Sequence, residues 1–142
     1  MGVAAVWGFA LLGVDAVPVR VEAHARGGLP GITIVGLPGA AVREAKERIR
    51  SGAACSGLPL PTKRITINLS PGDVPKEGSG FDLPVALATL AACGHLPSEA
   101  VAGVGAVGEV ALDGAVRPTR GILSVAEAAA RLNLRILIAP IE

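Results

Sequence analysis

A strand, a polar loop and a helix follow one another without interruption in residues 64–94, RITINLSPGDVPKEGSGFDLPVALATLAACG. The alternation of apolar and polar residues in 65–69 predicts a half-buried strand. Residues 70–80 are too rich in Gly, Pro and charge to continue the strand or to begin the helix. The helix is expected to begin with Asp82 as its N-cap and to end at Gly94. A polar loop held between two apolar elements is where we expect a functional site.

The rest of the chain has the pattern of a mixed α/β domain. Alternation or β-branched runs predict strands at residues 4–14, 17–25, 32–35, 101–112, 115–117 and 135–139. Helical periodicity predicts one helix from Pro38 to Gly57 and another that is capped by Thr119 and runs to about residue 132. An Asp113-Gly114 turn is expected to join two of the strands as a hairpin. The expected fold is a single α/β (α+β) sandwich domain over residues 1–142.

Hydrophobic residues make up 51% of the chain but aromatic residues only 2%, so the core must consist of Val, Ile, Leu and Ala. The longest apolar run, residues 1–14, is interrupted by glycines and is shorter than the roughly 20 residues that a membrane-spanning helix needs. It also lacks the basic start of a signal peptide. We therefore expect a cytoplasmic protein without membrane contact, in which Cys55 and Cys93 are buried free thiols.

Basic residues are concentrated in residues 41–80, which carry seven basic and four acidic groups. The candidate contacts with DNA or with a neighbouring subunit are Arg43, Lys46 and Arg50 on one helix stripe, with Lys63 and Arg64 entering the next strand. The alternative is a solvated helix face that pairs its own charges, Arg43 with Glu47 and Glu44 with Arg48. The sequence favours neither interpretation.

Three familiar nucleotide and metal motifs are excluded. Gly103, Gly105 and Gly108 have Rossmann spacing but precede a hairpin instead of a helix, so we interpret them as close-packed strand positions. No lysine follows a glycine, which excludes a P-loop. The two histidines, His24 and His95, have no ligand spacing. No metal site and no cofactor are therefore expected within this domain.

Three stretches carry a resemblance to a known family: GLPGITIVGLPGAAVREAKERIRSG (28–52), PKEGSGFDLP (75–84) and GEVALDGAVRPTRGIL (108–123). Together they resemble the N-terminal domain of the ComM/YifB-type magnesium chelatase-like AAA+ ATPases. The resemblance implies a Lon-protease-domain-like, ribosomal-protein-type fold with a left-handed βαβ crossover and three helices on a mixed sheet. It also implies a hexameric, ATP-driven DNA helicase that promotes branch migration in recombination and natural transformation. ATP and Mg would belong to an AAA+ motor expected beyond the chain end.

The same resemblance places the two catalytic positions of a Lon-like Ser-Lys dyad on this chain. The nucleophile falls on Gly80 and the general base on Leu123, so neither half of the dyad is present. This predicts a protease-like fold without protease chemistry. Two alternatives stay open: a Ser peptidase that uses Ser79, and a Mg-chelatase-like subunit module.

The loop itself has a candidate role in binding. Lys76, Glu77, Ser79 and Asp82 crowd the start of the predicted second helix. Backbone N–H groups and the helix dipole favour anions at such a position. A binding or assembly role, with an anion favoured at the start of the helix, is therefore expected for this loop. With three aromatic residues in the chain, any DNA contact would be electrostatic and non-specific.

Overall fold

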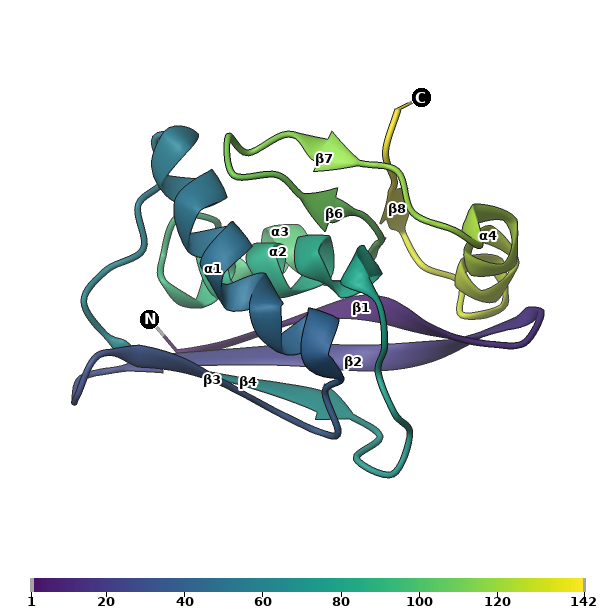
Figure 1. The fold of residues 1–142 in the computed structure, drawn as a ribbon, viewed down its shortest axis with the longest axis horizontal. Coiled ribbons are helices and arrows are strands. Elements are labelled where there is room, and N and C mark those ends of the chain that lie inside the picture. Colours follow the sequence, from purple (N-terminus) through teal and green to yellow (C-terminus); the bar gives the residue numbers. More distant parts are fainter. Residues whose placement is uncertain (1, 142) are drawn as a thin grey trace.

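The two longest strands, β1 and β2, pair antiparallel along their whole length and form the centre of a six-stranded mixed sheet. Its strand order is β3-β4-β2-β1-β5-β8, and β6 and β7 form a separate two-stranded hairpin (Figure 1). The computed structural model describes residues 2–141. The strands are β1 (Val3–Leu12), β2 (Asp15–Arg26), β3 (Gly31–Val35), β4 (Arg64–Ser70), β5 (Val104–Ala106), β6 (Glu109–Val110), β7 (Val116–Arg117) and β8 (Ile136–Ile138). The helices are α1 (Ala40–Cys55), the short 3-10 helix η1 (Ser79–Phe81), α2 (Asp82–Ala92), α3 (Ser98–Val101) and α4 (Ile122–Arg131).

Helices cover the two faces of the sheet unequally. On one face α2 packs on β1 and β2, and α1 lies across α2 (Figure 1). On the opposite face α4 packs near the turn between β1 and β2, where Val125 and Ala128 meet Phe9. Because side chains alternate along β1, Phe9 points away from the face that carries Val6 and Ala10. The helices therefore cover more of the sheet on one side than on the other, where α4 covers one end.

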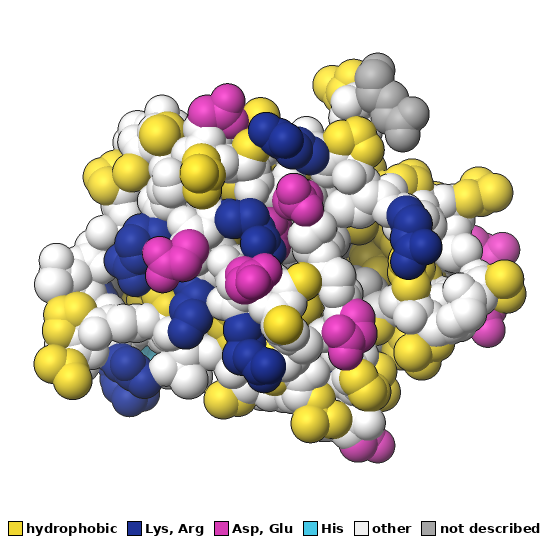
Figure 2. Space-filling view, in the orientation of Figure 1, with side chains coloured by type: hydrophobic (Ala, Val, Ile, Leu, Met, Phe, Trp, Pro, Cys, Tyr) yellow, Lys and Arg dark blue, Asp and Glu magenta, His cyan; other side chains and the backbone are white. Residues whose placement is uncertain are grey.

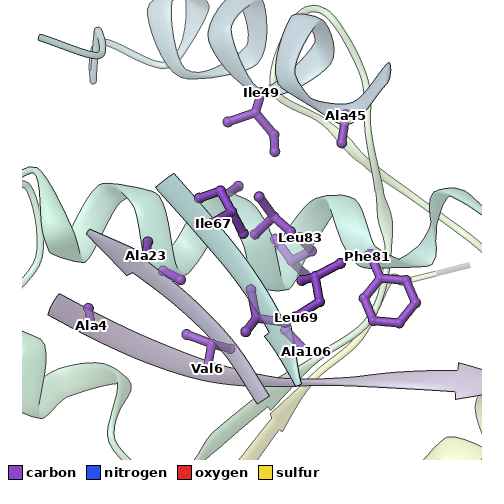
Figure 3. Packing of buried hydrophobic residues seen from close by; sticks show 14 of the residues in the cluster. Ala4, Val6, Ala23, Ala45, Ile49, Ile67, Leu69, Phe81, Leu83 and Ala106 are labelled. Carbon is purple, nitrogen blue, oxygen red and sulfur yellow. The ribbon is translucent and has the colours of Figure 1, made fainter. Parts of the chain in front are cut away.

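Small aliphatic side chains fill the main core, as the composition requires. Figure 3 shows Ile49 of α1 above Ile67 of β4 and Leu83 of α2, with Phe81 at one side of the cluster. Gly8 in β1 leaves room for this ring, because a Cβ there would lie 3.1 Å from Phe81. The single large aromatic residue of this cluster thus depends on a glycine opposite it.

The structure confirms the predicted fold class and most of the predicted elements. β1, β2, β3, β4, α1 and β8 agree with the expected elements to within a few residues. The Asp113-Gly114 turn joins β6 and β7, and the side chain of Asp113 accepts a hydrogen bond of 3.0 Å from the Ala115 N–H. Gly94, with φ 87°, closes α2 as predicted. The left-handed crossover stays a prediction.

The strand predicted over residues 101–112 is wrong. The chain forms α3, β5 and β6 there instead, and Gly103 turns with φ 71° between α3 and β5. After β5 the chain leaves the sheet to build the β6–β7 hairpin. Gly105 does lie in a close-packed strand, since a Cβ there would approach Leu134 to 2.6 Å. A run of apolar residues has the same pattern in the sequence whether the chain continues as one strand or leaves the sheet partway, which explains the error.

Two predicted helix caps and one ion pair are also wrong. The chain enters α2 through η1, so Phe81 is the N-cap and Asp82 lies inside the helix. Gly121, with φ 81°, replaces Thr119 as the N-cap of α4. Arg43 donates to the Pro38 carbonyl at 2.7 Å instead of pairing with Glu47.

The cysteines are free thiols, as predicted, but they are not both buried. Cys55, at the end of α1, is exposed, and Cys93 is half-buried. Burial raises the pKa of the Cys93 thiol, which keeps it protonated and unreactive. None of the helices in residues 2–141 has the length and apolar character needed to cross a membrane.

Gly36 provides a test of the fold at the end of β3. Its φ is 106°, and a Cβ there would overlap the carbonyl oxygen of Leu69. We expect Gly36→Ala to destabilise the chain by about 3 kcal/mol, from backbone strain and steric overlap together. The control is Gly27→Ala, because a Cβ at Gly27 meets nothing within 4 Å. Urea unfolding of both variants measures the difference, and equal midpoints would contradict strain and overlap at position 36 as the cause.

Candidate functional site

Lys76 fixes the polar loop from inside the protein. Its side chain is fully buried, and its Nζ donates to the carbonyl of Leu69 at 3.2 Å and to that of Pro71. Its backbone bonds to Leu37 and Gly39, at 3.1 and 2.7 Å. Burial lowers the pKa of Lys76, and the nearby charge of Asp73 opposes this. The structure therefore places Lys76 beneath the loop, where it holds backbone carbonyls, and not on the surface.

Asp82 is the second fully buried charge at this loop. Its carboxylate accepts hydrogen bonds from Arg48 Nε at 2.6 Å and Arg48 Nη2 at 2.9 Å. A third hydrogen bond, of 3.0 Å, comes from the backbone N–H of Val110. Burial raises the pKa of Asp82, whereas these donors stabilise its charged form and hold the pKa down. One carboxylate thus joins α1, α2 and the β6–β7 hairpin.

The pairing of Arg48 with Asp82 was not predicted. The i,i+4 spacing predicts only a surface pair of Arg48 with Glu44, and that pair does exist at 3.8 Å, with Glu44 exposed. The available signal was steric: Arg48 follows Ala45 and precedes Gly52 on one row of α1, and both are small enough to leave room for a long side chain. The second signal was Asp82, the one acidic residue at the start of α2.

A pocket of about 410 Å³ opens beside η1. Its lining combines an apolar floor with a polar rim and consists of Phe9, Leu11, Glu77, Gly78, Ser79, Gly80, Phe81, Val107, Pro118, Thr119, Arg120 and Val125. Figure 2 shows a hollow with a hydrophobic floor beside α4. Two of the four candidate loop residues, Glu77 and Ser79, line the pocket, whereas Lys76 and Asp82 are buried behind it.

The two positions that the Lon resemblance assigns to the dyad, Gly80 and Leu123, carry no reactive side chain. Gly80 lies in the pocket wall, where a Cβ would meet only ordinary contacts, 3.5 Å from Val107 and 3.7 Å from Thr119. Leu123 on α4 is 86% exposed. The hydroxyl oxygen of Thr119 is buried and, within residues 2–141, has no hydrogen-bond partner. At Gly80 the pocket wall has space for a side chain but carries none.

The candidate basic residues do not all lie on one surface. Arg43 and Arg50 are exposed on α1 and Lys46 is half-buried there. Arg64 belongs to the opposite face of the sheet, where it donates to the Thr33 hydroxyl. Figure 2 shows acidic side chains among the basic ones over α1. The structure thus places Arg43, Lys46 and Arg50 on one helix, on a surface of mixed charge, and Lys63 half-buried in the segment just before β4.

Metal binding has no support in the described part of the chain. Within residues 2–141, His, Cys, Asp and Glu side chains nowhere gather in a group of three or more that could hold a metal ion.

Comparison with known proteins places the chain in a family. Residues 21–142 match the family model described as subunit ChlI of Mg-chelatase. The chain belongs to this family. It is 47% identical to the YifB protein of Salmonella typhimurium over 139 residues, covering 98% of this chain and 28% of YifB. It is also 41% identical to the competence protein ComM of Haemophilus influenzae, covering 98% of this chain and 27% of ComM.

The ChlI-type chain therefore spans little more than a quarter of the length of these relatives. A more distant similarity, 36% identity over 131 residues, links it to a Lon protease of Chloroflexus aurantiacus, covering 86% of this chain and 15% of that protein. The predicted resemblance to a ComM/YifB-type, magnesium chelatase-like N-terminal domain is confirmed.

Removing Arg48 tests the buried ion pair. Arg48→Met leaves the Asp82 carboxylate buried with a single donor, so we expect a loss of about 3 kcal/mol at pH 7. The pKa of Asp82 in the folded variant then lies further above the value of about 3.9 expected in the unfolded chain. Since the folded state binds the proton more tightly, the deficit should shrink as the pH falls toward 4 and grow as it rises. Urea unfolding at several pH values measures this.

The control for this experiment removes the exposed partner of the same guanidinium. Glu44→Gln should change stability by no more than about 0.5 kcal/mol at any pH, because its pair with Arg48 is solvated. A deficit of Arg48→Met that is independent of pH would show that lost packing, and not the uncompensated carboxylate, is responsible.

Proposed function

We propose that this chain is a non-catalytic accessory domain of a ComM-type, ATP-driven DNA helicase. Such a protein would be a hexamer that promotes branch migration during recombination and natural transformation. Its AAA+ motor, which would bind ATP and Mg, would lie in the part of such proteins that this chain does not span. The observation that carries the non-catalytic role is the pocket wall at Gly80, where the Lon-like nucleophile is replaced by a residue without a side chain.

Three further features support this proposal. The base position, Leu123, bears an aliphatic side chain that points into solvent. The lysine that the loop retains, Lys76, is held by backbone carbonyls and cannot activate a hydroxyl in the pocket. The sequence contains no Gly-Lys pair that could begin a P-loop. A rigid domain that keeps its shape without reacting groups is suited to assembly or to contact with a macromolecule.

A peptidase based on Ser79 is the second candidate function, because Ser79 lines the pocket. No lysine or histidine is among the lining residues to take its proton. A Mg-chelatase-like subunit module is the third candidate and rests on the family description alone. Titration with a porphyrin, followed by its absorption spectrum, tests that candidate directly.

The chain should cleave neither casein nor peptides, and it should not hydrolyse ATP. Ser79→Ala should leave any background rate unchanged. Gly80→Ser should also stay inactive, because it restores the hydroxyl without a base to activate it. Fluorogenic casein and a coupled ATPase assay measure these rates. An activity that is lost in Ser79→Ala would overturn the non-catalytic proposal in favour of the peptidase.

The α1 surface should bind DNA weakly and without sequence preference. For so few charges we expect a Kd on the order of 10⁻⁴ to 10⁻⁶ M, which weakens with salt by a log–log slope of about 0.9 per phosphate contacted. Replacing Arg43, Lys46 and Arg50 together by Gln should flatten that slope, as measured by fluorescence anisotropy.

The matched control removes the same charge elsewhere. Arg20, Arg117 and Arg131 are exposed on β2, β7 and α4, and their joint replacement by Gln changes the net charge equally. If both triple variants flatten the slope alike, net charge and not the α1 surface governs the binding. If neither does, α1 is a solvated helix face.

A further inference from the structure

The sheet has an outer face, which points away from α1 and α2 and carries α4 only near the β1–β2 turn. Arg26 ends β2 at the opposite end from that turn. At about 3.3 Å per residue, the 12 residues of β2 separate these two ends by roughly 35 Å. Figure 1 shows no helix of residues 2–141 over the outer face at this far end. Side chains on the outer face there are therefore open to solvent.

Arg26 and Arg64 lie directly opposite each other at this end, as neighbours on β2 and β4. Ala25 and Ile65 beside them belong to the core, so both arginines point to the outer face. Directly opposite residues have Cβ atoms only about 5 Å apart, and like charges at that separation repel. Because arginine side chains do not lose their proton in proteins, this repulsion persists at every working pH.

The chain supplies no carboxylate to balance these two charges. Glu22 is the one acidic residue that β1–β4 present on the outer face, and it already contacts Arg20 at 3.5 Å and the side-chain amide of Asn68 at 3.1 Å. Within residues 2–141 neither Arg26 nor Arg64 takes part in an ion pair. An anion that binds here must therefore come from outside the described chain.

The Arg64 guanidinium is held over β3. Its Nη2 donates to the Thr33 hydroxyl, and its Nη1 lies above Gly31, where a Cβ would be only 2.9 Å away. In the described chain, Nη2 is the one nitrogen of this guanidinium that has a hydrogen-bond acceptor. The absence of a side chain at Gly31 thus leaves room for a guanidinium that keeps donors available.

The loop after Arg26 adds backbone donors beside the two arginines. Residues 27–30, Gly-Gly-Leu-Pro, join β2 to β3, and a Cβ at Gly28 would lie 3.8 Å from the Cβ of Arg64. The N–H groups of Gly27 and Gly28 donate no backbone hydrogen bond within residues 2–141. Guanidinium groups and free backbone N–H groups are donors that proteins commonly use to bind phosphate.

From this arrangement we propose that Arg26, Arg64 and the Gly27-Gly28 loop form a binding site for one phosphate group. Two guanidiniums match a phosphate dianion in charge and present planar sets of donors to its oxygens. A carboxylate would balance only one of them. Inorganic phosphate, the 5′ end of a polynucleotide and its backbone all carry this group. The inference goes beyond the proposed function, which assigns DNA contact to α1, and does not depend on it.

Titration of the isotope-labelled chain with inorganic phosphate tests the site at single residues. At constant ionic strength, we expect saturable shifts of the amide NMR signals of Gly27, Gly28 and Gly31. Arg26→Gln should raise the Kd about tenfold, because it removes one of the two charges. Arg64→Lys should raise it less, because lysine keeps the charge and loses the planar set of donors.

Arg20→Gln is the matched control. Arg20 lies on the same strand and face and is exposed, but its guanidinium pairs with Glu22. The substitution changes the net charge equally, and the Kd for phosphate should stay within about twofold of the original. Equal losses in Arg20→Gln and Arg26→Gln would overturn the site, as would amide shifts that chloride reproduces at the same ionic strength.

Urea unfolding separates phosphate binding from an effect on the fold. Because the two arginines repel each other, Arg26→Gln should leave the urea midpoint in chloride buffer unchanged or raise it. Phosphate should raise the midpoint of the original chain, since a ligand stabilises the state that binds it, and should have little effect on the variant. An equal rise in both chains would contradict the proposal.

Two single DNA strands of about ten nucleotides, one with a 5′-phosphate and one with a 5′-hydroxyl, identify the source of the phosphate. Shifts of the three glycine amides with the phosphorylated strand alone indicate a terminal phosphate, and equal shifts with both strands indicate a backbone phosphate. Shifts with inorganic phosphate but with neither strand indicate a small ligand. DNA contact on α1 does not affect these amides. The absence of saturable shifts with all three probes would overturn the site.

Discussion

The carboxylate of Asp82 is the point on which the arrangement around the pocket depends. Two donors from Arg48 and one from the Val110 backbone bind it inside the protein, where an unpaired charge would be strongly unfavourable. These contacts tie the start of α2 to the middle of α1 and to the β6–β7 hairpin. The main chain just before Asp82 is η1, which forms the pocket wall. The position of that wall therefore follows from a buried ion pair, and not from local helix geometry.

Lys76 fixes the other end of the same loop by a different interaction. Its ammonium group is buried and donates hydrogen bonds to the carbonyls of Leu69 and Pro71. Glu77 and Ser79 lie between these two ends and line the pocket, and the carboxylate of Glu77 lies beside Gly39 at the start of α1. Buried polar contacts therefore hold the loop at both ends, and at Gly80 it has no side chain.

The sequence predicted the elements of the site better than their arrangement. It located the polar loop and assigned Lys76, Glu77, Ser79 and Asp82 to it, and the Lon resemblance predicted that the two dyad positions fall on Gly80 and Leu123. It could not distinguish the two residues that face the pocket from the two that lie behind it, because both kinds are charged or polar and alternate with glycines. Arg48 was assigned to Glu44 for a related reason. The i,i+4 rule sees partners on one helix only, whereas the stronger acceptor lies 34 positions further along the chain.

What the sequence by itself determined is local. Alternation fixed β2 and β4, helical periodicity fixed α1, and the glycine at position 94 ended α2, because each of these signals acts between residues a few positions apart. The tertiary structure alone decided that the apolar stretch after α2 divides into α3, β5 and β6, and that Asp82 faces inward to an arginine instead of capping its helix. These features depend on which distant segments pack together, and the free energy of burying a charge or pairing a strand is set by that packing and not by neighbours in the sequence.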